Sequence, residues 1–195
     1  MATKAEKSNQ TRSTVIEEAR KIFARDGYAK ASLSEIVRNA KVTTGAIYHH
    51  YGDKKGLFTA VAEHLEQEIL AIIADRISTI SSDWERLEKG VYYTLDVCSR
   101  PDIQRIVFQD APTVVGLHEW REIEMKYSFG IMMQNIQSLS EQGKISGGSP
   151  ELVAQILLGT IIEAAHAVAL AEDKELALNQ ARETVLTMLR AIKVS

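Results

Sequence analysis

Apolar residues recur every three to four positions along most of this chain, which is the spacing of helices that bury one face. The first such segment predicts a helix over about residues 12–25, with a stop at Gly27. Its apolar positions are Val15, Ile16, Ala19, Ile22 and Phe23. No segment alternates convincingly between apolar and polar residues as a strand would, so the pattern predicts an all-α fold.

Two short helices joined by a tight turn follow the first. Ser32 and Glu35 have the Ser-x-x-Glu spacing of a capping box, which predicts a helix that ends near Ala40. A few residues later, Thr43 or Thr44 can cap a second short helix. Two short helices connected in this way form a helix-turn-helix.

Longer helices account for the rest of the chain. Asp53 is expected to cap a helix over about residues 54–79, long enough to link two parts of the molecule. Later helices are predicted at about 82–99, 101–109, 116–142, 151–171 and 173–193. The helix over 151–171 is apolar on nearly every face, so either the core or a second subunit must cover it.

The charge is divided unequally along the chain. Residues 1–58 hold 11 Lys and Arg against 6 Asp and Glu, a net charge of +5, whereas the remainder holds 12 against 20, a net charge of −8. A basic N-terminal part on an acidic protein indicates that only this part meets a polyanion such as DNA.

The sequence gives no sign of export, of a membrane span or of a disulfide. The first residues lack the apolar core of a signal peptide, and the longest apolar stretch contains Glu163 and His166. A single cysteine, Cys98, fits a small buried apolar position. We expect a cytoplasmic protein without a membrane partner.

The neighbouring histidines His49 and His50 suggest a metal site or a catalytic site at first sight. Adjacent helical side chains point about 100° apart, so the two rings cannot converge on one ion. A contact surface fits better, because Thr44, Gly45 and Tyr48 share the helix with His49 and offer hydrogen-bonding groups and close approach. We therefore expect no metal site and no catalytic residue.

Residues 11–58, TRSTVIEEARKIFARDGYAKASLSEIVRNAKVTTGAIYHHYGDKKGLF, resemble the DNA-binding domain of the tetracycline-repressor (TetR) family of bacterial regulators. Residues 107–124, VFQDAPTVVGLHEWREIE, also resemble the effector domain of one branch of that family. The resemblance implies a helix-turn-helix domain over 11–58 and an effector-binding and dimerisation domain over 59–195. Residues 1–10 are polar and aperiodic and are expected to form a flexible arm.

By this resemblance the helix-turn-helix touches DNA through one set of residues. They are Ser32, Ser34, Thr44, Gly45, Tyr48, His49, Tyr51 and Lys54. Family members usually carry glycine in the turn after the second helix, where this chain has Lys41. Lys41 is therefore expected in a left-handed conformation, from which it can meet a phosphate.

The resemblance also implies a homodimer formed by the helices 151–171 and 173–193, and a small-molecule pocket. Two-fold symmetry places two recognition helices on a palindromic operator. The pocket can be lined by Tyr93, Phe108, Trp120, Tyr127 and Met132, although each also fits a plain core position.

Glu163 and His166 leave three interpretations open. A buried ion pair of Glu163 with Arg105 or Arg121 is favoured over a ligand-facing role for either residue. The Glu-x-x-His spacing also occurs in di-iron bundles, but no second copy of that motif is present.

Taken together, the sequence predicts a ligand-responsive regulator that binds DNA, most often a repressor in this family, and not an enzyme or a cofactor protein. Two alternatives remain. One is a helical metalloprotein that uses Glu163 and His166. The other is a dimeric binding protein whose helix-turn-helix no longer binds DNA, which the basic N-terminal part argues against.

Overall fold

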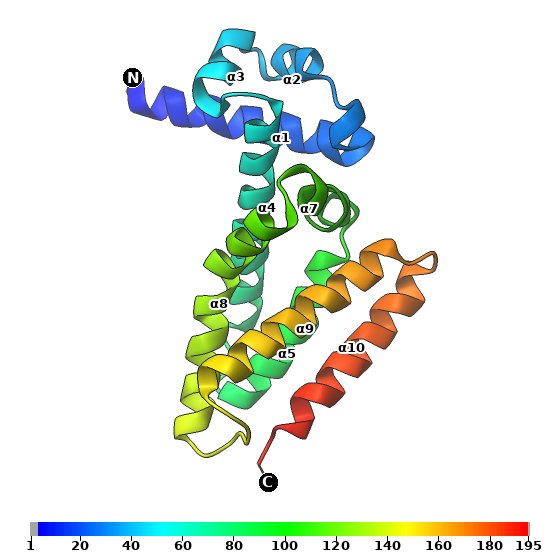
Figure 1. Cartoon of the computed structure of the whole chain (residues 1–195). Helices are drawn as coiled ribbons and strands as arrows, with labels where there is room; N and C mark the ends of the chain where they lie inside the picture. The colour runs from blue at the N-terminus through cyan, green and yellow to red at the C-terminus, as the bar shows by residue number, and fades with distance from the viewer. Residues whose placement is uncertain (1–3, 195) are drawn as a thin grey trace. The chain divides into compact units, whose positions relative to one another are not determined.

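The computed structural model describes the backbone of residues 4–194 and the side chains of residues 10–194 (Figure 1). Its helices are α1 (Lys4–Lys30), α2 (Leu33–Ala40), α3 (Thr44–Tyr51), α4 (Lys54–Ile77), α5 (Asp83–Cys98), α6 (Pro101–Ile103), the π-helical η1 (Gln104–Asp110), α7 (Ala111–Val114), α8 (Leu117–Glu141), α9 (Pro150–Leu170) and α10 (Lys174–Ala191). The described part has no named strand, only an isolated bridge between Ile145 and Lys193. The predicted all-α fold is confirmed.

The chain divides into two compact units. Unit 1 comprises the residues up to Leu65 together with Pro101–Trp120, and unit 2 comprises Glu66–Arg100 together with the residues from Arg121 on. The helix-turn-helix expected over 11–58 lies in unit 1. Helix α1 already begins at Lys4, inside the segment expected to be a flexible arm, and residues 1–3 lie outside the described part.

Local capping signals set the helix ends of the helix-turn-helix. The hydroxyl of Ser32 accepts a hydrogen bond from Glu35 N at 3.3 Å, and that of Thr43 accepts one from Ala46 N at 3.2 Å. Asp53 accepts a hydrogen bond from Gly56 N at 2.7 Å at the start of α4. Each cap satisfies an amide that the first turn of the helix leaves without a partner, as the sequence predicted.

The core of unit 1 forms where α1, α2, α3 and the start of α4 meet. Ala19, Ile36, Leu57 and Phe58 each expose 0 % of their surface. The rings of Phe23 and Phe58 pack edge to face with centroids 5.1 Å apart. An aromatic pair of this kind adds to the free energy gained by burying apolar area, so it holds α4 against α1.

The segment Pro101–Trp120 is bound to α1 by two carboxylates. Asp102 forms an ion pair with Arg20, and Asp110 accepts a hydrogen bond from the backbone amide of Tyr28 at 2.7 Å. Just before Tyr28, α1 bends at Gly27, whose φ of 72° strongly favours glycine. This segment lies in the effector domain by sequence order but belongs structurally to unit 1.

Unit 2 is built on helices α5, α9 and α10, which pack on one another, with α8 and the later part of α4 completing it (Figure 1). Cys98 is buried at the end of α5, and burial raises the pKa of its thiol well above its usual value. The cysteine is therefore a core residue, as the sequence predicted. Glu66 and Glu124 are also buried in this unit, at 6 % and 4 % exposed.

Candidate nucleic-acid interface and internal cavity

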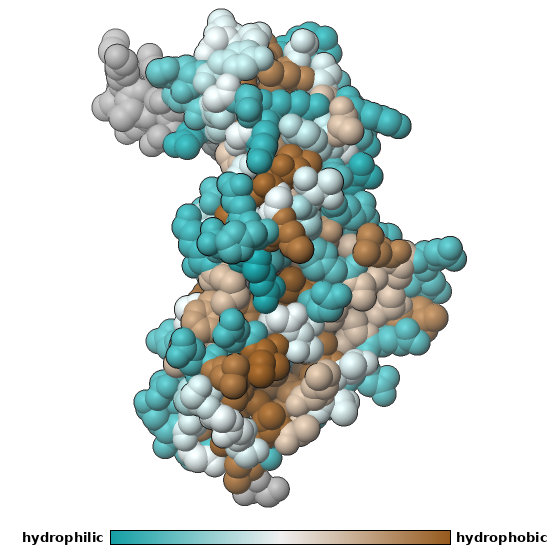
Figure 2. Space-filling view, in the orientation of Figure 1, coloured by the Kyte–Doolittle hydropathy of each residue, from teal (hydrophilic) through white to brown (hydrophobic). Residues whose placement is uncertain are grey.

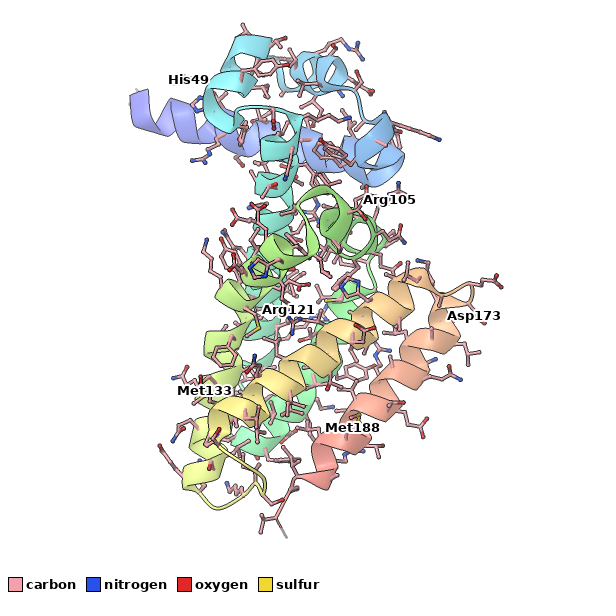
Figure 3. All side chains as sticks on the ribbon, viewed as in Figure 1. His49, Arg105, Arg121, Met133, Asp173 and Met188 are labelled. Atoms are coloured by element: carbon pink, nitrogen blue, oxygen red, sulfur yellow. The ribbon has the colours of Figure 1, made fainter. Side chains whose placement is uncertain are left out.

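Helix α3 presents one buried residue and an exposed polar surface. Ile47 is 1 % exposed and anchors the helix in the core of unit 1, whereas Tyr48 is 53 % exposed. Thr44, Gly45 and His49 are also exposed, and the His49 ring packs edge to face on that of His50, with centroids 5.1 Å apart (Figure 3). Four of the residues predicted to face DNA thus lie on the solvent side of one short helix.

The turn between α2 and α3 adds a cationic group beside this surface. Lys41 is exposed, and its φ of 54° and ψ of 40° place it in the left-handed region, as the sequence predicted. The turn closes with a hydrogen bond of 3.2 Å from Val42 N to Val37 O. Ser32 and Ser34, at the start of α2, are exposed as well. Hydroxyl and ammonium groups of this kind suit phosphate oxygens.

Tyr51 and Lys54 lie differently from the other predicted contacts. Tyr51 is half-buried, and burial raises the pKa of its phenol against a smaller opposite effect of Arg12. The Lys54 ammonium lies 4.8 Å from the centre of the Tyr28 ring and donates a hydrogen bond of 3.4 Å to Ala29 O. The Lys54 ammonium therefore has partners within unit 1, and its predicted contact with DNA requires the side chain to turn outward. The hydroxyl of Tyr51 is buried, and its contact with DNA stays a prediction.

An internal cavity of about 80 Å³ lies between α4, α5, α8 and α9, entirely within unit 2. Most of its wall is aliphatic, with Arg86, Thr94, Ser128 and Asn135 as its polar side chains. In Figure 2, hydrophobic residues gather on the viewed face between α8 and α9. An apolar cavity with a few polar groups is the usual form of a small-molecule site.

The seven residues predicted to face a ligand are spread over both units of the chain. Met132 lines the cavity. Phe108 and Trp120 are buried in unit 1, at 6 % and 1 % exposed. In unit 2, Tyr93 lies under the Arg76 guanidinium, 5.3 Å from ring centroid to Cζ, and the Tyr127 hydroxyl accepts a hydrogen bond of 3.1 Å from Gln67.

Glu163 and His166 complete that set of seven. His166 is half-buried on α9, whereas Glu163 is exposed and lines an open groove between α9 and α10. The buried ion pair expected for Glu163 is therefore wrong, because its carboxylate stays in solvent in the single chain. The two arginines considered as its partners pair elsewhere, Arg105 with Asp110 and Arg121 with Glu124. Over the described residues, no three His, Cys, Asp or Glu side chains gather as a metal site would require.

Sequence reasoning missed the α5 wall of the cavity. Arg86, Gly90 and Thr94 follow one another at intervals of four residues and share one side of α5. This pattern could have indicated the cavity from the sequence, because the side of a helix that faces the core is usually apolar throughout, whereas this one contains a glycine and two polar residues. The sequence search instead selected aromatic residues, which do not form this wall.

Two family models match the chain. One, described as "Bacterial regulatory proteins, tetR family", covers residues 15–61, and another, "Tetracyclin repressor-like, C-terminal domain", covers residues 84–192. The chain is 27% identical to the transposon Tn10 TetC protein of Escherichia coli over 168 residues, 86% of this chain and 85% of that protein. It is 28% identical over 173 residues to the transcriptional repressor BepR of Brucella suis, covering 82% of this chain and 80% of that protein.

A solved structure covers the whole chain. The crystal structure of a transcriptional regulator from Pectobacterium atrosepticum, of the same family, superposes with a TM-score of 0.87 at 33% sequence identity. The match covers 100% of this chain and 99% of the other. The similarity therefore extends over both the helix-turn-helix and the C-terminal helices.

Proposed function

Because the chain belongs to the tetracycline-repressor family of transcription regulators, we propose that it binds an inverted-repeat operator in double-stranded DNA as a homodimer and leaves it when a small effector binds. Members of this family are regulators and not enzymes, so the proposal includes no catalytic residue and no cofactor. The Brucella suis relative is named a repressor, which supports repression rather than activation of transcription. The proposed location is the cytoplasm.

The proposal rests on the exposed side of α3. Tyr48, at 53 % exposed, stands beside exposed Thr44 and His49, while Ile47 fixes the helix from behind. A helix held by one buried residue can enter the major groove without losing its packing. Lys41 next to this helix, and the net charge of +5 on residues 1–58, supply the attraction to phosphates.

The homodimer is proposed on the surface of α9 and α10. Large apolar side chains on these helices are at least 50 % exposed, namely Leu152, Ile156, Leu170, Leu176 and Met188. Ile156 also lines the groove that contains Glu163, along which Figure 2 shows largely apolar residues on α9. Exposed apolar side chains on two helices that pack together indicate a protein interface.

The apolar character of α9 has a second interpretation. By length and composition α9 could cross a membrane, and 39% of its most apolar window is buried. Its packing against α5 and α10 and the exposed carboxylate of Glu163 favour a helix that a second subunit covers. In such a dimer the two recognition helices stand roughly 34–36 Å apart, one turn of DNA.

The effector is proposed to bind in the cavity of unit 2. Helices α5 and α8, which contribute to its wall, continue along the chain into the two ends of Pro101–Trp120, the segment bound to α1 in unit 1. A change in the cavity can therefore reach the helix-turn-helix through Asp102 and Asp110.

Binding to the DNA upstream of the protein's own gene, measured by fluorescence anisotropy over a salt series, tests the function. We expect log affinity to fall steeply with log salt concentration, because phosphate contacts release counterions. Tyr48→Ala should reduce discrimination between this DNA and random DNA, whereas His50→Ala, at the neighbouring exposed position, should leave it unchanged.

Equal binding to both DNA sequences without salt dependence would contradict the regulator. That result would favour the alternative of a dimeric binding protein whose helix-turn-helix no longer binds DNA.

A further inference from the structure

We infer that the cavity between α4, α5, α8 and α9 takes an uncharged aliphatic molecule that donates a hydrogen bond, such as a straight-chain alcohol. The inference rests on the proposed function only for the effector role of this molecule. The chemical class of the ligand follows from the side chains of the cavity wall.

The apolar part of the wall is aliphatic. Helix α4 contributes Ile69, Ile73 and Ile77, four residues apart on one side of the helix, and α9 contributes Leu158 and Ile161. The side chains that the structure places around the cavity include no aromatic ring. A planar aromatic ligand would therefore find no ring to stack on, whereas an alkyl chain gains free energy with each CH₂ it buries.

The cavity is small. Its volume is about 80 Å³, and the three isoleucines of α4 are spaced over roughly 12 Å at the rise of an α-helix. Ligand sites for drug-sized molecules are larger, on the order of 300 Å³ or more. An alkyl chain, which can extend along the isoleucines of α4, therefore suits this space better than a drug-sized ring system.

Two polar side chains of the wall have oxygens that can accept a hydrogen bond from a ligand. The Thr94 hydroxyl donates its own hydrogen to Gly90 O at 2.8 Å, which leaves its oxygen free to accept. The amide nitrogen of Asn135 donates one hydrogen to Ile131 O at 2.9 Å, which leaves its carbonyl oxygen and its second N–H for a ligand. A ligand hydroxyl can donate to the Thr94 or Asn135 oxygen and can also accept from that N–H, so it uses both kinds of group.

The charge of the wall is already balanced. Arg86 is its cation, and the guanidinium forms an ion pair with Asp83 and donates to Ile80 O at 3.3 Å. Hydrogen bonds from Gln142 at 2.6 Å and Ser138 at 3.2 Å, together with Arg86, hold the pKa of Asp83 below its usual value. A bound carboxylate or ammonium would lose its hydration without gaining an unmatched counter-charge.

Gly90 leaves open the middle of the α5 wall. A Cβ atom built there meets no atom within 4 Å beyond its chain neighbours and the nearby backbone of its own helix, so a larger side chain has room to extend into the cavity. Glycine inside a helix costs about 1 kcal/mol relative to alanine, so replacement should not weaken α5. Gly90→Leu is therefore a variant whose cavity is filled by the new side chain.

Gly130→Leu is its matched control, because Gly130 is exposed on α8, also has no atom within 4 Å of an added Cβ, and lies outside the cavity wall.

Isothermal titration of the full-length protein at neutral pH with four eight-carbon probes tests the inference. The probes are 1-octanol, octanoate, octylammonium and 2-phenylethanol, which separate charge and aromaticity from size. We expect 1-octanol to bind at least about tenfold more tightly than each of the others. Gly90→Leu should weaken that binding by a similar factor, whereas Gly130→Leu should retain it.

Comparable affinity for octanoate, octylammonium or 2-phenylethanol would overturn the inference. So would unchanged 1-octanol binding by Gly90→Leu with a native circular dichroism spectrum. If Gly90→Leu does not fold, Thr94→Val, which removes one acceptor, should weaken binding of 1-octanol more than binding of octane. Equal losses for both would again overturn the assignment.

Operator binding measured in parallel separates this inference from the proposed function. Intact operator binding with no affinity for 1-octanol refutes the ligand class alone. Binding of 1-octanol with no operator binding refutes the regulator and supports the ligand class.

Discussion

The backbone amide of Tyr28 donates a hydrogen bond of 2.7 Å to the carboxylate of Asp110, 82 residues later in the chain. The same carboxylate accepts from Arg105 Nε at 3.3 Å, and the Arg105 guanidinium lies against Gly27, where α1 bends (Figure 3). One side chain thus joins the end of α1 to η1. This joint is the contact through which we expect the segment 101–120 to hold the helix-turn-helix.

Asp110→Ala should lower the free energy of unfolding by about 2 kcal/mol, because a charge-assisted hydrogen bond is lost and the Tyr28 amide is left without its partner. Urea denaturation measures this change. The control is Asp75→Ala on the exposed side of α4, which should change the value by less than about 0.5 kcal/mol. Equal effects of the two substitutions would show that Asp110 does not join these elements.

Lys41→Gly should raise stability while it weakens DNA binding. Glycine adopts the φ of 54° found at Lys41 without the steric cost of a side chain, so we expect a gain of about 1 kcal/mol in thermal or urea unfolding. Loss of the ammonium should reduce the salt slope of operator binding by about 1. Lys89→Gly, an exposed lysine inside α5, should destabilise the protein, since its backbone is helical.

Ala167→Glu should produce a folded monomer. Ala167 is exposed in the single chain and lines the groove between α9 and α10, so a charge there is harmless until a second subunit covers it. Light scattering coupled to size exclusion gives the mass directly. Leu117→Glu, an exposed apolar position outside this groove, should keep the dimer mass. A dimer that survives Ala167→Glu would move the interface away from α9 and α10.

Stability should fall as pH rises from about 4.5 to about 8 because of Glu66. Burial, and to a smaller extent the nearby Glu124, raises the pKa of Glu66 from its usual 4.5 to about 8. In this window the folded protein keeps a proton that the unfolded chain has lost, so unfolding becomes easier by an amount on the order of 5 kcal/mol.

Glu66→Gln should remove most of that fall in urea titrations at several pH values, because an amide does not ionise. Glu172→Gln, at an exposed position, should leave the wild-type pH profile in place. An unchanged fall in the Glu66 variant would assign the pH dependence to other groups.

Local signals made the helix-turn-helix predictable. The capping box at Ser32 and the cap at Thr43 depend on residues three positions apart, and both form as expected. The left-handed Lys41 was expected from the family resemblance, because members usually carry glycine in this turn, and its φ of 54° agrees. The polar exposed side of α3 follows from its period, since a helix that buries Ile47 turns its neighbours outward. Contact of these residues with DNA stays a prediction.

The partners of long side chains were not predictable in the same way. Lys54 was expected at a phosphate, which stays a prediction, and the sequence did not indicate that its ammonium lies over the Tyr28 ring in the free chain. Glu163 was expected in a buried ion pair, and it is exposed in the groove beside α10. Both outcomes depend on which helix packs alongside, and helical period alone does not specify a neighbour.

The sequence by itself determined the all-α fold, the capped starts of α2, α3 and α4 and the helix-turn-helix, because period and capping act between residues a few positions apart. The tertiary structure decided that α1 extends over Lys4–Lys30, that residues 101–120 join unit 1 and that a small aliphatic cavity lies beside Gly90. Both depend on side chains tens of residues apart, such as Tyr28 and Asp110, whose meeting follows from the packing of whole helices rather than from any local pattern.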